Sequence, residues 1–196
     1  QYIDSVLALK QRTDAPQVLL GLEMDYFPRE EDYLRRMVTA YPYDYIIGSV
    51  HYLGTWGFDF TPEDWQRLRE EDVYRCYAEY FKTLAAMART GFAQIAAHPD
   101  IIKIFSIDYF RNWLRGSEAR DLVRAALTAV KDSGMAMEIS SAGLRKPCRE
   151  IYPGPELMEL AAALDLPVTI SSDAHNAADL MYGFDDLIAY AREHGY

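Results

Sequence analysis

Short apolar runs alternate with longer amphipathic stretches along this chain. Five runs are apolar for most of their length and are bounded by glycine, proline or polar residues: 18–22, 45–50, 92–97, 135–139 and 168–170. Runs of this length with such boundaries are typical of buried strands. Because helical stretches separate them, the pattern predicts an α/β protein built on a parallel sheet or barrel.

The segments between the runs carry apolar residues at helical spacing. The clearest are residues 34–41, 73–88, 122–130 and 157–164, and residues 1–10 are also predicted to be helical. Gly134 follows the third segment and Pro155 precedes the fourth, at positions where helices commonly end and begin. Burial in a core explains such apolar stripes. We therefore expect one domain over residues 1–196, with helices packed around the sheet.

Groups that can bind metal or phosphate follow each predicted strand. In chain order they are Glu23 and Asp25, His51, His98, Ser140 and Ser141, and Asp173 with His175. In barrels and open α/β sheets, the loops at the carboxyl ends of the strands converge on one site. We therefore expect these side chains, which are distant in sequence, to meet there.

The chain has four histidines, and three of them occupy such strand ends: His51, His98 and His175. The fourth, His194, is predicted to be a surface residue. A single histidine at a strand end is more often structural than a ligand. Together with Glu23 and Asp173, however, the three predict a metal site. Imidazole nitrogens and carboxylate oxygens suit zinc, manganese or iron better than calcium or magnesium.

The charge and cysteine content narrow the classes of partner. The formal net charge is -10, from 30 acidic and 20 basic residues, which disfavours nucleic acid as a partner. A small anionic substrate is still possible, because bound divalent cations would dominate the local field. Cys76 and Cys148 form neither a metal pair nor a disulfide framework, and no apolar run approaches the roughly 20 residues that cross a bilayer. We expect a cytoplasmic protein with no membrane partner.

Five strings of the sequence resemble the successive motifs of the histidinol phosphatase branch of the PHP superfamily, the HisK type. They are GLEMDYFP, DYIIGSVHYL, AHPDIIKIF, EISSAGLRKPCREIYP and PVTISSDAHNAADL. The resemblance implies a distorted (β/α)7 TIM-like barrel with two or three divalent transition metals, zinc, manganese or iron, that hydrolyses phosphate esters. Matched motif by motif, it implies the metal ligands Glu23, His51, His98, Asp173 and His175, and Arg145 as the residue that holds the substrate phosphate.

The start of the chain departs from this family. Its members begin with a strand that carries a His-X-His pair, followed by a further histidine, whereas no histidine precedes His51 here. Five strands do not comfortably close a parallel barrel, and 196 residues are fewer than the roughly 250 of the eight-stranded form. Five ligands complete the coordination sphere of one metal ion but leave the spheres of two ions incomplete. We therefore expect the N-terminal strand, with its ligands, to lie ahead of Gln1.

The expected reaction is hydrolysis of histidinol phosphate to histidinol and phosphate, a step of histidine biosynthesis. The catalytic centre would consist of Glu23, His51, Asp173 and His175. Arg145 could hold the phosphate in a bidentate way, or form a surface ion pair with Glu150. Ser140 could donate a hydrogen bond to the substrate or be strand-end structure. Lys103 could contact the phosphate or be a solvated lysine at a helix end.

Two further features bear on the site. Tyr52 and Trp56, in the glycine-bearing stretch HYLGTWGFDF, are expected in a loop over the site that determines substrate specificity. Asp25 and Asp100 could orient ligand histidines, or act as caps or turn residues.

Three alternatives to a histidinol phosphatase stay open at this point. The chain could be another PHP phosphoesterase that acts on nucleotides or phosphopeptides. It could be a metal-dependent amidohydrolase on a related barrel, or a metal-depleted binding or structural module. The expected partner is a small phosphorylated metabolite, and the sequence indicates no oligomeric state.

Overall fold

A parallel five-stranded sheet forms the centre of the computed structural model, which describes residues 1–14 and 16–196. The strands are β1 (Gly21–Asp25), β2 (Tyr45–Ser49), β5 (Ile95–Ala96), β6 (Ala136–Ser140) and β7 (Val168–Ser171), hydrogen-bonded in that order. Every neighbouring pair is parallel. The strands thus follow chain order with helical connections between them, which confirms the predicted α/β class.

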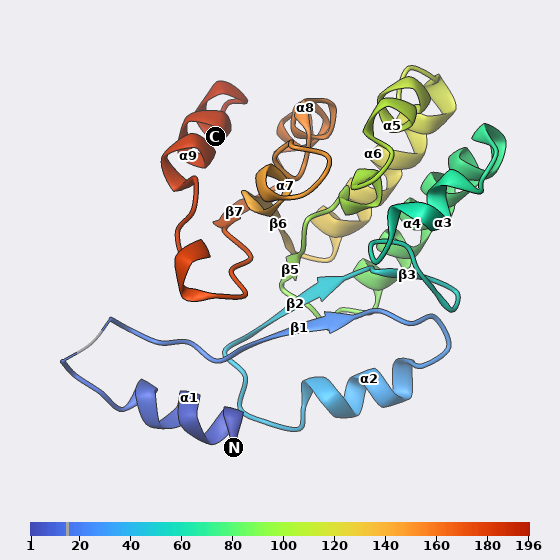
Figure 1. Ribbon diagram of the computed structural model, residues 1–196. Helices are drawn as coiled ribbons and strands as arrows, with labels where there is room; N and C mark the ends of the chain where they lie inside the picture. The colour runs from blue at the N-terminus through green and yellow to red at the C-terminus, as the bar shows by residue number, and fades with distance from the viewer. Residues whose placement is uncertain (15) are drawn as a thin grey trace.

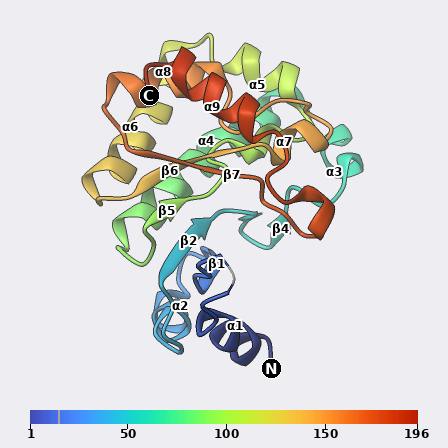
Figure 2. The ribbon, with the colours of Figure 1, turned by 90° about the vertical axis from the view of Figure 1, so that its left-hand side faces the viewer.

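The predicted helical segments correspond to the longer helices of the structure. They are α1 (Tyr2–Lys10), α2 (Glu31–Val38), α4 (Glu70–Arg89), α6 (Ser117–Asp132) and α8 (Pro155–Ala163). Figure 1 shows α1 and α2 below β1 and β2, and the later helices on the opposite side of the sheet; Figure 2 shows the same division from the side. Within the described residues, no helix is both long and apolar enough to cross a bilayer.

Several shorter elements were not predicted. They are α3 (Pro62–Gln66), η1 (Ile101–Lys103), α5 (Ile107–Trp113), α7 (Ala142–Arg145), η2 (Ala177–Asp179) and the hairpin of β3 (Tyr52–Leu53) with β4 (Trp56–Gly57). Most span too few residues to display a helical period. Helix α5 has seven residues and buries only Phe110, so its apolar pattern is short. Helix α9 (Phe184–Glu193) does carry an apolar stripe, because Phe184, Tyr190 and Ala191 pack on the core beside buried Leu187, and it ends at the residue before His194.

Strand β1 begins and ends three residues later than its predicted run. Leu20 precedes the ladder because its backbone N–H donates to Asp44 Oδ2 (2.6 Å) and its carbonyl accepts from the Asp44 N–H (2.8 Å). Glu23 therefore lies within the strand and not after it. Since side chains alternate along a strand, Glu23 and Asp25 face the same side while buried Met24 faces the other.

Strand β5 covers only two residues of its predicted run, 92–97. The Gln94 side chain takes part in the pairing, as its Oε1 accepts the backbone N–H of Ile46 (2.7 Å). Beyond the strand, the Ala97 N–H donates to the Gly48 carbonyl (2.9 Å). The chain thus stays bonded to β2 up to the residue before His98.

An aromatic core fixes helix α4 behind these strand ends. Tyr77, Tyr80 and Phe81 are fully buried, and the Phe81 ring is stacked on Trp113 of α5 with 5.8 Å between centroids. Gly48 in β2 permits this close approach, because a Cβ there would lie 2.6 Å from the Met87 sulfur. Such dense packing provides a rigid support for the residues that follow β2.

Candidate metal site

A cavity of about 300 Å³ lies at the carboxyl ends of the strands. Its lining residues are Glu23, Asp25, Ser49, His51, Tyr52, Asp59, Phe60, His98, Ile101, Lys146, Asp173 and His175. All five predicted metal ligands are among them. The structure thus gathers these side chains from β1 and from the segments that follow β2, β5 and β7, as the strand-end rule leads one to expect.

Glu23, His51 and His98 lie close enough together to share one ion, with ligand atoms within 4.8 Å of one another. Glu23 Oε1 is 3.2 Å from His98 Nε2 and 3.8 Å from His51 Nε2. Two atoms that bind a tetrahedral zinc ion at its usual distances are about 3.3 Å apart. These side chains therefore fit a small divalent ion that accepts both nitrogen and oxygen ligands.

The ring of His51 is held by Asp25. Asp25 Oδ1 lies 2.6 Å from His51 Nδ1, and both residues are partly buried. When Nδ1 donates to this carboxylate, Nε2 is the unprotonated nitrogen, and it is the one near Glu23. Of the two roles predicted for Asp25, this contact favours the orienting one.

His98 is buried, with 2% of its surface exposed, and its backbone N–H donates to Glu138 Oε2 (2.7 Å). Burial alone would lower the pKa of His98. The hydrogen bond with Glu23 and the charges of Glu138, Glu23 and Asp173 nevertheless raise it to about 9. Burial likewise opposes the charge of Glu23, but His98 and His51 lower the pKa of Glu23 to about 2. The metal-free site thus holds an ion pair, and a metal would replace its proton.

Asp173 and His175 line the same cavity but do not belong to the group of three. Asp173 has a φ of 47°, in the left-handed region that aspartate tolerates better than most residues. Its N–H donates to Ser171 Oγ (3.2 Å), which holds this turn after β7. The His175 side chain is 80% exposed, with Nδ1 3.0 Å from the Asp173 carbonyl oxygen. This pair thus offers a further carboxylate and imidazole to the same cavity.

Arg145 lies beside the cavity and does not line it. Its Nη2 donates to the Ser172 carbonyl (2.7 Å), its Nε lies 3.5 Å from Asp179 Oδ1, and its guanidinium covers the Tyr182 ring. The alternative prediction of an ion pair with Glu150 is wrong. Arg145 thus holds the backbone next to Asp173, while its buried Nη1 has no partner within the described residues.

Lys103 and Asp100 form a buried network away from the cavity. Lys103 is fully buried, and its Nζ lies 2.6 Å from both Asp100 Oδ2 and Glu150 Oε1. Asp100 also accepts the Gly154 N–H (2.8 Å). The prediction that Lys103 is solvated is therefore wrong. Its buried position also argues against a contact between Lys103 and phosphate. The carboxylate of Asp100 binds this lysine and the backbone of the turn. The described contacts of Asp100 include none with a predicted ligand histidine.

Ser140 belongs to the strand end. It is fully buried, its N–H donates to the Tyr152 carbonyl (2.6 Å), and its Oγ accepts the Ala142 N–H (3.3 Å). These contacts correspond to the structural role that the sequence left open, and they argue against a hydrogen bond from Ser140 to a substrate.

The predicted aromatic loop is only partly at the site. Tyr52 lines the cavity, whereas the Trp56 ring lies against Trp65, with 5.2 Å between centroids. Sequence reasoning missed Asp59 and Lys146, which also line the cavity. For Lys146 the signal was its place next to Arg145 in the fourth motif, and for Asp59 it was its place in the stretch HYLGTWGFDF, which was expected over the site.

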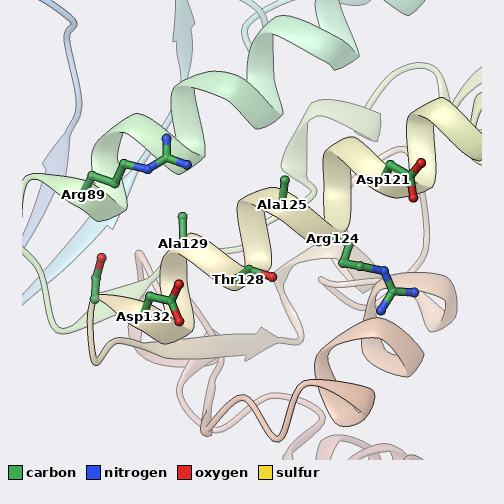
Figure 3. Close-up of a pocket in the computed structure, with 8 residues that line it drawn as sticks. Arg89, Asp121, Arg124, Ala125, Thr128, Ala129 and Asp132 are labelled. Carbon is green, nitrogen blue, oxygen red and sulfur yellow. The ribbon is translucent and has the colours of Figure 1, made fainter.

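A larger hollow, of about 520 Å³, lies along α6 beside the end of α4, and no histidine among the described residues lines it. Figure 3 shows that its two arginines do not converge: Arg89 extends from the end of α4, and Arg124 points away from it on the far side of α6. It is an open groove with no metal-binding group of three. The chemistry is concentrated in the smaller cavity.

Comparison with known proteins identifies the family of this chain. Residues 1–142 match the PHP domain family. The chain is 35% identical over 198 residues to a probable histidinol-phosphatase of Deinococcus radiodurans, covering 100% of this chain and 72% of that protein.

Two solved structures share the fold. HisK from Listeria monocytogenes superposes with a TM-score of 0.84 at 23% identity, over 94% of this chain and 74% of that one. The histidinol phosphate phosphatase from Lactococcus lactis, complexed with zinc, L-histidinol and phosphate, gives a TM-score of 0.72 at 20% identity, over 100% and 73%. The family match and the 35% identical relative show that the chain belongs to the PHP family, in its branch of histidinol-phosphatase proteins.

Proposed function

We propose that this chain is a metal-dependent phosphatase that hydrolyses histidinol phosphate to histidinol and phosphate. The observation that carries the proposal is the group of Glu23, His51 and His98 in the wall of a cavity that admits a small phosphate ester. Family membership supports phosphate-ester chemistry. The substrate is supported by the name of the Deinococcus relative and by the ligands of the Lactococcus structure.

The proposed cofactors are two or three divalent ions, zinc, manganese or iron. Glu23, His51 and His98 would hold one ion, and Asp173 with His175 would contribute to another. Bound ions of this kind lower the pKa of water and offset the charge that develops on a phosphoryl group. Asp25 would keep His51 turned toward the ion.

The phosphate would be held by cationic side chains at the Asp173 end of the cavity. Lys146 lines the cavity and is exposed, and Arg145 contacts the backbone of Asp173. The unpartnered Nη1 of Arg145 is a donor suited to a phosphoryl oxygen. Arg145 would thus both position the loop after β7 and bind substrate, with Lys146 as a second point charge.

The experiment compares two histidines of the same chain. His51→Ala removes a proposed ligand, whereas His194→Ala changes the histidine at the end of α9, where Nδ1 is bonded to the Tyr190 carbonyl (2.8 Å). Both purified proteins are loaded with zinc or manganese and assayed for phosphate release from L-histidinol phosphate.

Loss of a partner that only orients a ligand typically costs 10–100-fold in activity, so loss of the ligand should lower kcat/KM by more than about 100-fold. His194→Ala should retain the activity of the unchanged protein. Equal activity of both variants, or an unchanged protein that turns over nucleotides or phosphopeptides but not histidinol phosphate, would contradict the proposal.

A further inference from the structure

Asp59 is a carboxylate of the cavity that the metal site does not use. It lies in the turn that follows the β3–β4 hairpin, eight residues after His51, and lines the same cavity. Its Oδ1 is buried and has no hydrogen-bond partner within the described part of the chain. A buried oxygen of this kind is costly unless a ligand supplies a donor, so it marks a position where a ligand is expected.

The other three acidic residues of the cavity all have an imidazole nearby. Glu23 lies 3.2 Å from His98, Asp25 lies 2.6 Å from His51, and Asp173 Oδ1 lies 3.6 Å from His175 Nδ1. For Asp59, no cation lies within 4.0 Å among residues 1–14 and 16–196. It therefore presents a carboxylate that the described residues leave without a cation.

The position of Asp59 favours an organic cation over a metal ion. Asp59 is outside the group of Glu23, His51 and His98, and unlike Asp173, which is also outside it, Asp59 has no imidazole within 4.0 Å among the described residues to complete a ligand set. Phe60 follows Asp59 in the sequence, its ring lies 5.7 Å from that of Tyr52, and all three residues line the cavity. Aromatic faces beside a carboxylate suit an ammonium group and a flat ring, not a small ion that needs several oxygen or nitrogen ligands.

The hairpin is built to keep these rings at the mouth of the cavity. The Tyr52 ring contacts Phe27 and Phe60, with centroids 5.1 Å and 5.7 Å apart, and Phe60 is 63% exposed. Gly57 makes room for Phe60, because a Cβ there would lie 2.5 Å from the ring. An exposed ring that the backbone accommodates in this way is available for stacking on a bound molecule.

We propose that Asp59, together with Tyr52 and Phe60, forms the subsite that binds the cationic and ring-bearing end of the substrate. The carboxylate accepts hydrogen bonds from the ammonium group, and the two rings cover the flat ring. This inference rests on the proposed function and names the residues that select an aminoalkyl phosphate over other phosphate monoesters.

The test is a comparison of two substrates on two proteins. L-histidinol phosphate carries an ammonium group, and the matched imidazolyl-alkyl phosphate without the amine does not. Asp59→Asn keeps the shape of the side chain and removes its charge. In this variant the ammonium group of the substrate loses the carboxylate that pairs with it, which is a costly loss. We therefore expect kcat/KM for histidinol phosphate to fall by about 100-fold, mostly through KM. For the amine-free ester it should change less than about 2-fold, with metal content unchanged.

Several results would overturn the subsite. Equal losses on both esters would make Asp59 a residue of the general machinery, and loss of bound metal in Asp59→Asn would make it a metal ligand. The unchanged protein provides a measurement that does not depend on the variant: it should prefer the amine-bearing ester by at least about 10-fold. No preference, in a protein that hydrolyses both, contradicts the subsite alone, whereas no hydrolysis of histidinol phosphate contradicts the proposed function.

Discussion

In the metal-free protein His98 carries a proton at neutral pH, because its carboxylate neighbours raise its pKa to about 9 from an ordinary value of 6.5. An ion bound at Nε2 must displace this proton. We therefore expect the affinity for zinc to rise with pH throughout the range below about 9 and to level off above it. At pH 7.5, calorimetry in two buffers of different ionisation enthalpy should show release of about one proton from His98.

Glu23→Gln provides the comparison, since it removes the hydrogen bond and charge that contribute to the raised pKa of His98. Proton release at pH 7.5 should shrink in this variant, although zinc binds more weakly. Zinc binding without buffer-dependent heat in the unchanged protein would show that His98 is already neutral, contrary to this account.

Asp25 provides a second residue-scale prediction. Because it fixes the ring of His51, Asp25→Asn should weaken zinc binding about 10–100-fold while leaving the fold intact. A competition titration with a chelator measures the affinity. The matched control is Asp132→Asn, at the exposed C-terminal end of α6. Retention of full zinc affinity in Asp25→Asn would mean that Asp25 does not determine the orientation of His51.

At this scale the sequence predicted which residue types gather, and less well what each one does. Glu23, His51 and His98 could be found because they stand at or near strand ends in a chain with few histidines. Lys103 could not be placed, since burial of a lysine depends on partners such as Glu150, 47 residues away. Asp59 stands out through its buried Oδ1, which has no hydrogen-bond partner among the described residues.

At the scale of elements, the turn after β5 depends on the buried Lys103 network. Lys103→Met leaves Asp100 and Glu150 without this cation inside the protein, so the free energy of unfolding should fall by about 3–5 kcal/mol. Urea unfolding measures the change. Lys82→Met, on the exposed face of α4, is the control and should change stability by less than about 0.5 kcal/mol.

Neutralising Asp100 tests whether its unpaired charge causes the loss of stability in Lys103→Met. In Lys103→Met combined with Asp100→Asn, the unpaired buried charge is gone, so part of the lost stability should return. A single variant as stable as the Lys82→Met control would show that the network does not hold this turn.

The presence of each main strand and helix was easier to predict than the residues at which it begins and ends. Strand β1 begins later than the apolar run that predicted it. The reason is that Asp44, 24 residues from Leu20, binds the Leu20 backbone and keeps it out of the ladder. The hairpin of β3 and β4 and the short helices were missed, since they lack a full apolar period. Tertiary contacts decide these limits, and a single sequence does not display them.

At the scale of the whole molecule, the order of the strands decides where the chemistry lies. Five parallel strands in chain order direct their carboxyl ends to one side, so side chains from Glu23 to His175 share a cavity. That arrangement was predictable from the alternation of strands and helices. The larger groove along α6 shows that size alone does not identify the site.

The central claim is that this cavity hydrolyses a phosphate ester with metal ions held by Glu23, His51 and His98. The most direct test measures phosphate release from L-histidinol phosphate by purified protein before chelation, after removal of metal and after addition of zinc or manganese. We expect activity to disappear with the metal and to return in proportion to the metal bound. Undiminished turnover by metal-stripped protein, or none by fully loaded protein, would contradict the claim.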